Sequence, residues 1–160
     1  VKKVLMGREY ASEECVTLVG PSLKSIEKVR VLGPVRAKTQ VEISKTDTFI
    51  LKVSPPVRPS GNVEGSERLV IVGPKGSVYL NEGVIIAKRH IHLTPETAEE
   101  RNVKDKDIVW VKIETEGRKA ILGDVVVRVS PSYAPAMHID TDEANAISAF
   151  NGLEGEIIEL

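Results

Sequence analysis

Apolar residues along the chain fall in short runs that turn residues separate, and this pattern predicts a mainly β fold. Several runs end at a Gly-Pro pair or at a cluster of charged residues, as strands bounded by tight turns do. Many short strands with few helices predict small closed β-barrels, because closure removes exposed sheet edges. The predicted strands lie at residues 16–19, 26–32, 41–44, 69–72, 83–87, 90–92, 108–113, 119–129, 136–140 and 155–160.

Polar and apolar residues alternate over 40–43, where Gln40 and Glu42 alternate with Val41 and Ile43. Successive side chains of a strand point to opposite faces, so Gln40 and Glu42 are expected on the face opposite Val41 and Ile43. This segment therefore predicts a strand with one buried face and one polar face.

Two short helices are expected in the second half of the chain. Thr94 followed by Pro95 is typical of an N-cap and a first helical residue, and Asp140 begins a second segment of this kind. Residues 46–52 are ambiguous and are compatible with a helical turn that leads into a strand. The proline-rich segment 55–62 predicts a linker or a surface loop without regular structure.

A strand-and-turn pattern occurs twice. The Gly-Pro pairs that begin at Gly20 and Gly73 follow similar apolar runs and stand 53 positions apart, which is 73 minus 20. The same offset aligns Arg36 with Arg89, and each arginine introduces a polar cluster after an apolar run. The sequence therefore predicts two copies of one β-unit, with candidate functional residues at equivalent places.

Length and composition are compatible with two small barrels related by this repeat and capped by short α-helices. The chain has 160 residues, of which 41% are hydrophobic, and this suffices for packed cores. We expect a first β-unit over residues 1–62 and a second over 63–160, with an approximate boundary and with exchange of strands between the barrels left open. The single cysteine, Cys15, excludes an internal disulfide framework and fits a reducing compartment.

The charge of the chain argues against two classes of partner. The formal net charge is -1 and 28% of residues are charged, so no field of one sign is expected that would select nucleic acid or an anionic membrane. No run approaches the ~18 apolar residues of a membrane span, and no signal segment is recognised. The expected location is the cytoplasm.

The histidines provide the candidate chemistry. Two of the three lie in the segment Arg89–His92, directly after an apolar run, and a strand there would project His90 and His92 to the same face. His138 lies in another strand-compatible segment and would complete a three-histidine metal site with open coordination positions. The alternative is a pair of half-exposed histidines on a strand, with no metal.

Four segments of the chain resemble the PduL-type phosphotransacylases, also called phosphate propanoyltransferases. The resemblance covers nearly the whole chain, with the segments in the order of the family. It implies two β-barrels capped by short helices, two zinc ions, and transfer of an acyl group between coenzyme A and inorganic phosphate. The segments are Val31–Arg36, Thr39–Ser44, Arg89–His92 and Met137–Asn145.

The resemblance also implies roles for particular side chains. His90, His92 and His138 would bind one zinc ion. Glu42 would help to bind the other zinc, and Arg36 would hold the phosphate during catalysis, since a guanidinium fits phosphate oxygens and stays charged.

Each of these polar side chains also has a structural alternative. Arg36 would otherwise form a surface salt bridge, and Glu42 would be a solvent-facing strand residue. Arg89 is a candidate for phosphate binding, and pairing with a carboxylate is the equally weighted alternative.

One part of the family pattern has no counterpart here. Members have a further N-terminal strand with its own Arg-His-x-His segment, which supplies histidines to the first zinc. The chain begins at Val1 rather than Met, so we expect a sequence trimmed at its N-terminus. The alternative is a variant that has lost part of one metal site.

These observations favour a zinc-dependent phosphate acyltransferase that reversibly converts a short acyl-coenzyme A, propanoyl or acetyl, and phosphate into acyl phosphate and coenzyme A. A non-catalytic β-barrel with a structural metal is the main alternative, and a metal-dependent hydrolase is a third. A structural zinc has four protein ligands, and no fourth histidine or paired cysteine completes such a set, so the ligand count favours catalysis. The resemblance further implies a homodimer and leaves open residence in a bacterial microcompartment, with its shell as a partner.

Overall fold

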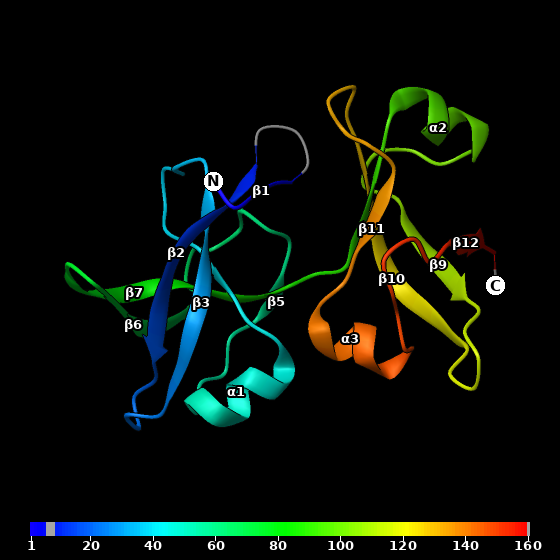
Figure 1. Cartoon of the computed structure of the whole chain (residues 1–160). Coiled ribbons are helices and arrows are strands. Elements are labelled where there is room, and N and C mark those ends of the chain that lie inside the picture. Colours follow the sequence, from blue (N-terminus) through cyan, green and yellow to red (C-terminus); the bar gives the residue numbers. More distant parts are fainter. Residues whose placement is uncertain (6–8, 160) are drawn as a thin grey trace. The chain divides into compact units, whose positions relative to one another are not determined.

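The computed structural model describes residues 1–5 and 9–159 and divides into two units, Val1–Ala87 and Lys88–Leu160 (Figure 1). Each unit contains one curled sheet that forms a half-barrel, with few and short helices. The prediction of a mainly β fold with two small barrel-like units is confirmed.

The described residues of the first unit form seven strands and the helix α1. Its strands follow the order β1-β2-β6-β7-β4, with β3 paired to β2 and β5 paired to β7. The helix α1 begins after Ser44, whose side chain accepts a hydrogen bond from the Asp47 backbone in a capping box. The elements are β1 (Lys3–Val4), β2 (Tyr10–Val19), β3 (Ser25–Gly33), β4 (Val41–Glu42), α1 (Lys45–Leu51), β5 (Val57–Arg58), β6 (Glu67–Gly73) and β7 (Gly76–Ala87).

The two Gly-Pro pairs of the repeated pattern belong to two hairpins of this first sheet. Gly20 lies in the connection from β2 to β3, and Gly73 ends β6 just before β7. The two hairpins are joined because β2 pairs antiparallel with β6. The expected boundary after residue 62 falls inside this sheet, whereas the units divide after Ala87, since β6 and β7 pair with strands of the first unit.

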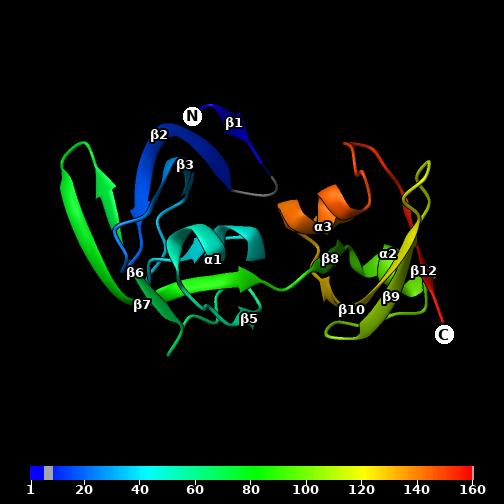
Figure 2. The same ribbon diagram turned by 90° about the horizontal axis from the view of Figure 1, so that it is seen from below.

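The proline-rich segment contains a short strand that the sequence did not predict. Val57 and Arg58 form β5 and pair in parallel with Ile86 and Ala87 of β7 (Figure 2). The prediction of no regular structure is wrong for these two residues. They lie between prolines and keep the backbone N–H that proline lacks, so they add a short edge strand.

In the second unit, residues 88–159 form five strands in the order β11-β8-β10-β9-β12 and two helices. The strands β8 and β10 run parallel, while β11 pairs antiparallel with β8 at the edge of the sheet. Thr94 and Asp140 are the N-caps of α2 and α3, as predicted. The elements are β8 (His90–Leu93), α2 (Pro95–Glu100), β9 (Ile108–Ile113), β10 (Ala120–Val129), β11 (Ala136–His138), α3 (Thr141–Ala146) and β12 (Gly155–Ile158).

Each unit has its own hydrophobic core, so each can hold polar side chains on a packed sheet. The alternation predicted over 40–43 is confirmed, because Val41 and Ile43 are buried and Glu42 is exposed. The core of the first unit is Leu18, Val41, Ile43, Leu51, Val53, Leu69, Leu80 and Val84. The core of the second is Ile91, Leu93, Ala98, Val111, Ile113, Val125, Val127 and Ile147.

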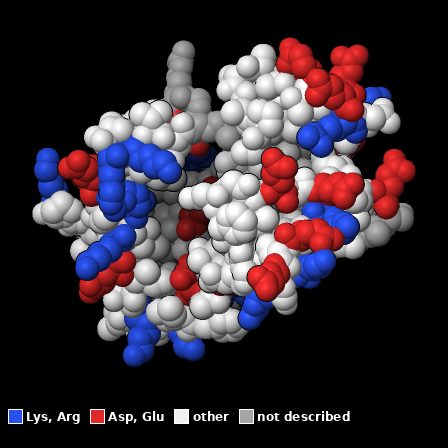
Figure 3. Space-filling model, turned by 45° about the vertical axis from the view of Figure 1, so that its right-hand side comes forward, with Lys and Arg blue, Asp and Glu red and all other residues white. Residues whose placement is uncertain are grey.

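Charged side chains of both signs are interspersed over the face seen in Figure 3, in line with the formal net charge of -1. No field of a single sign extends over that face. Among the described residues, no helix combines the length and the apolar character that crossing a membrane requires.

Candidate functional site

The three histidines meet at the edge of the second sheet. His90 and His92 lie on β8 with the buried Ile91 between them, and the edge strand β11 ends at His138. The antiparallel register pairs His138 directly with His90. Strand pairing and the alternation of side chains therefore bring three imidazoles to one face.

The imidazole rings are close enough to share a ligand. Their centroids lie 4.8 Å apart for His90 and His92, 4.9 Å for His90 and His138, and 4.6 Å for His92 and His138. One ring nitrogen from each histidine lies within 4.8 Å of the others. Three nitrogens on one zinc ion stand about 3.4 Å apart at ordinary bond lengths. Small rotations of the rings would therefore close the cluster around a single metal ion.

The hydrogen bonding of the rings leaves nitrogens that can act as ligands. The Nδ1 atom of His90 lies 3.0 Å from the Lys88 carbonyl, which favours the tautomer that donates from Nδ1 and keeps the Nε2 lone pair. The Nε2 atoms of His92 and His138 are buried and make no hydrogen bond in the described part of the chain, although both rings have other contacts. The donor set of three imidazoles suits zinc.

His92 is held in the neutral form that binds metals. Burial, followed in order by the neighbouring His138, His90 and Arg128, lowers the pKa of His92 from 6.5 to about 4. The ring of Tyr133 stacks on His92 with a centroid separation of 3.9 Å and covers one of its faces. A neutral imidazole at neutral pH needs to lose no proton before it binds a metal ion.

Arg89 connects three elements of the second unit. Its Nε atom donates to the Gly123 carbonyl at 2.7 Å, and its Nη1 atom pairs with Glu143 at 2.7 Å. The same Glu143 accepts from the Asp140 backbone in the capping box of α3. Of the two alternatives from the sequence, the structure has Arg89 paired with a carboxylate, and its contact with phosphate stays a prediction.

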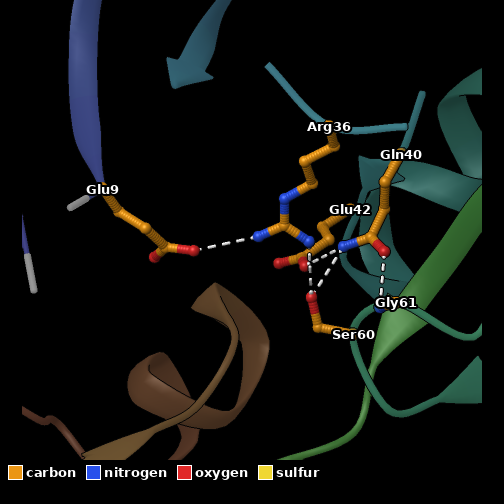
Figure 4. Close-up of polar contacts among 6 residues, drawn as sticks. All are labelled: Glu9, Arg36, Gln40, Glu42, Ser60 and Gly61. Atoms are coloured by element: carbon orange, nitrogen blue, oxygen red, sulfur yellow. Dashed lines mark hydrogen bonds and ion pairs between the residues drawn. The ribbon is translucent and has the colours of Figure 1, made fainter. Parts of the chain in front are cut away.

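Arg36 and Glu42 belong to the first unit (Figure 4). Glu42 ends β4, and Arg36 lies in the segment between β3 and β4. The Arg36 Nη2 atom pairs with Glu9 at 2.9 Å, and the side chains of Arg36 and Glu9 are about half exposed, at 48% and 50%. The guanidinium is therefore accessible to a ligand from solvent.

Gln40 occupies the centre of this polar group. Its Nε2 atom donates to Glu42 at 2.6 Å and to the Ser60 hydroxyl at 2.8 Å. Its Oε1 atom accepts from the Gly61 backbone at 2.7 Å. Ser60 also accepts from the Arg36 Nη1 atom at 3.4 Å, so these side chains form one hydrogen-bonded group (Figure 4).

This group lies at the polar side of a cavity of about 300 Å³ in the first unit. Apolar residues of β2, β3 and β6 contribute much of the lining. The polar lining residues are Arg30, Arg36, Lys38, Thr39, Gln40 and Glu42. A small ligand with an anionic part and an apolar part fits such a lining. The apolar residues include Val16, Leu18, Val29 and Ile71.

The structure thus collects the predicted site residues other than Arg89 in two clusters, one in each unit. Arg36 and Glu42 lie together in the first unit, and the three histidines lie together in the second. Sequence reasoning did not assign Ser60 or Tyr133 to a site, because each is distant along the chain from the residue it contacts. The alternation that placed Gln40 beside Glu42 was a usable signal for Gln40.

Comparison with known proteins identifies the family of the chain. The family model described as phosphate propanoyltransferase matches residues 1–150. The chain is 56% identical over 160 residues to a phosphate propanoyltransferase of Thermotoga maritima, and the match covers 100% of the chain and 76% of that relative. It is 54% identical over 145 residues to the enzyme of the same name from Lachnoclostridium phytofermentans, with 91% and 68% covered. The chain therefore belongs to the phosphate propanoyltransferase family, which is a family of acyltransferase enzymes.

Proposed function

We propose that this chain is a zinc-dependent phosphate acyltransferase. It transfers a short acyl group, propanoyl or acetyl, reversibly between coenzyme A and inorganic phosphate. The observation that carries the proposal is the cluster of His90, His92 and His138, whose ligand nitrogens lie within 4.8 Å of one another. Three protein ligands leave a coordination position for substrate, which distinguishes a catalytic zinc from a structural one.

In this proposal His90, His92 and His138 hold one zinc ion, and Glu42 contributes a carboxylate to a second. Bound zinc would polarise the thioester carbonyl and stabilise the leaving thiolate. The depressed pKa of His92 supports the first assignment, since the ring is a neutral donor at neutral pH. The exposed carboxylate of Glu42, held by Gln40, supports the second.

Arg36 binds the phosphate in this proposal. Its half-exposed guanidinium carries a planar set of donors that matches phosphate oxygens, and its partner Glu9 is an exposed carboxylate that an anion can displace. A phosphate oxygen so oriented attacks the carbonyl carbon of the thioester. The new carbon–oxygen bond gives acyl phosphate, and the carbon–sulfur bond breaks to release coenzyme A as the thiolate.

The experiment that tests the function is the release of free coenzyme A from propanoyl- and acetyl-coenzyme A with and without phosphate. We expect release that needs phosphate, stops after chelation and returns with added zinc. The ratio of the two rates gives the acyl preference. No release from folded, zinc-loaded protein would contradict the proposal, and release without phosphate would identify a thioester hydrolase instead.

We further propose that the enzyme acts in the cytoplasm as a homodimer. The single cysteine fits the cytoplasmic location, and the resemblance to the family implies the dimer. Size-exclusion chromatography with light scattering tests the dimer. Co-purification with microcompartment shells tests the alternative location inside such a compartment.

A further inference from the structure

A carboxylate and a guanidinium lie in the same cavity of the first unit without forming an ion pair. Glu42 and Arg36 both line the cavity, and the ion pair that Arg36 makes there is with Glu9. No ion pair joins Arg36 to Glu42, although both belong to the described residues. Opposite charges near each other in a partly exposed site attract, so something must keep these two apart.

The side chains of Gln40 and Ser60 link the two charged groups through hydrogen bonds. Gln40 donates to Glu42 at 2.6 Å and to Ser60 at 2.8 Å, and Arg36 donates to Ser60 at 3.4 Å (Figure 4). Every link between the charges is therefore a neutral amide or hydroxyl.

The orientation of the Gln40 amide is determined by its partners. The Gly61 backbone N–H can only donate, so the Gln40 oxygen faces Gly61 at 2.7 Å. The two hydrogens of the amide nitrogen then point toward Glu42 and Ser60. A glutamate at position 40 would lack these donors, and an apolar side chain would lack all three bonds.

We propose that Gln40 is a positioning residue that holds the Glu42 carboxylate away from the Arg36 guanidinium. The Nη2 side of Arg36 is engaged by the exposed Glu9, and Gln40 keeps the Nη1 side from being taken by a second carboxylate. Arg36 then remains accessible to phosphate, while Glu42 keeps a fixed orientation. This inference rests on the proposed phosphate-binding role of Arg36.

The test is calorimetric titration of the purified chain with inorganic phosphate. Gln40→Met retains the length of the side chain and removes its hydrogen bonds, so Glu42 can pair with Arg36 and compete with phosphate. An exposed ion pair of this kind weakens phosphate binding by about 3- to 5-fold. In the enzyme assay, the KM for phosphate rises by the same factor, with little change in the KM for acyl-coenzyme A.

A second substitution separates this role from a merely structural one. Glu42→Gln removes the competing charge, so phosphate affinity in the double variant Gln40→Met with Glu42→Gln returns to that of Glu42→Gln alone. General damage to the loop would not be repaired in this way. Asn62→Met is the matched control, since it makes the same amide-to-thioether change at an exposed residue of the segment between β5 and β6. Gln40→Ala repeats the comparison if the methionine variant does not fold by circular dichroism.

The outcomes distinguish this inference from the function it rests on. If the unaltered chain binds phosphate and Arg36→Ala removes binding, the role of Arg36 stands. A Gln40→Met affinity within about 1.5-fold of the unaltered chain, or a loss that Glu42→Gln does not restore, then overturns the role of Gln40 alone. Absence of phosphate binding to the unaltered chain overturns both.

Discussion

The two units hold their polar clusters at sheet edges by different means. In the second unit the histidines lie on β8 and the edge strand β11, and backbone register pairs His138 with His90. In the first unit Glu42 ends the edge strand β4, but Arg36, Gln40 and Ser60 come from loops and are joined by side-chain hydrogen bonds. One cluster is therefore fixed by the ladder of a sheet, and the other by a small polar network.

This difference predicts how each cluster responds to substitution. Truncation of a histidine removes one ligand and leaves the strands that carry the others, so its effect is confined to the metal. Truncation of a residue in the first-unit cluster allows the neighbouring side chains to form new hydrogen bonds or ion pairs. Their loops are less restrained than strands, which backbone hydrogen bonds hold in place.

The largest effect is expected from the histidine cluster. His92→Ala leaves two imidazoles, so we expect loss of the bound zinc and a fall in phosphate-dependent coenzyme A release of at least about 100-fold, since removing even an outer-shell partner costs about 10- to 100-fold. Zinc content and activity are measured together. Ile91→Val is the control on the opposite face of β8, where zinc should be retained. Full zinc content in His92→Ala would refute the three-histidine site.

Arg36 gives the next largest effect. Arg36→Lys keeps the positive charge but loses the planar fork, so we expect the KM for phosphate to rise about 10-fold, and Arg36→Ala to raise it further. Steady-state kinetics with phosphate as the varied substrate measure this. Glu9→Gln removes the competing carboxylate and should lower the same KM. An unchanged KM in both arginine variants would mean that phosphate binds elsewhere.

Arg89 is expected to act on stability more than on phosphate binding. Its half-buried pair with Glu143 and its bond to Gly123 join β8, β10 and α3, so Arg89→Met should lower the free energy of unfolding by about 1–3 kcal/mol. Urea denaturation measures the loss, and the KM for phosphate is the second readout. A raised KM with unchanged stability would instead assign Arg89 to the substrate.

The sequence predicted the elements that have local signals. The caps at Thr94 and Asp140 and the alternation at Val41 and Ile43 depend on neighbouring residues, so those elements were found. The boundary between the units depends on the pairing of β6 with β2, which joins residues about 50 positions apart. No local pattern reports such a pairing, and the approximate boundary expected after residue 62 differs from the division after Ala87.

The same distinction applies to the two clusters. The period of a strand alone predicted that His90 and His92 share one face. His138 was assigned to the same metal site because it carries the same kind of ligand. The partners of Arg36 had no such signal, because Glu9 and Ser60 are distant in sequence and have residue types common on any surface. Residues that share one face of a strand can be inferred from the period of the sequence. Side-chain hydrogen bonds between distant residues can be identified only once the fold is known.

The smallest effect concerns pH. The pKa of His92 is about 4 in the folded chain and 6.5 as its ordinary value, so the unfolded chain takes up a proton as pH falls below 6.5 while the folded chain does not. Uptake by the unfolded state alone lowers stability. The metal-free chain should therefore lose stability between pH 6.5 and 4, and His92 should contribute no slope above or below this range. Thermal melts of the chelated chain and of His92→Gln measure the contribution. If His92→Gln loses as much stability between pH 6.5 and 4, groups other than His92 cause the pH dependence. If its stability varies less with pH, burial of the His92 imidazole causes it.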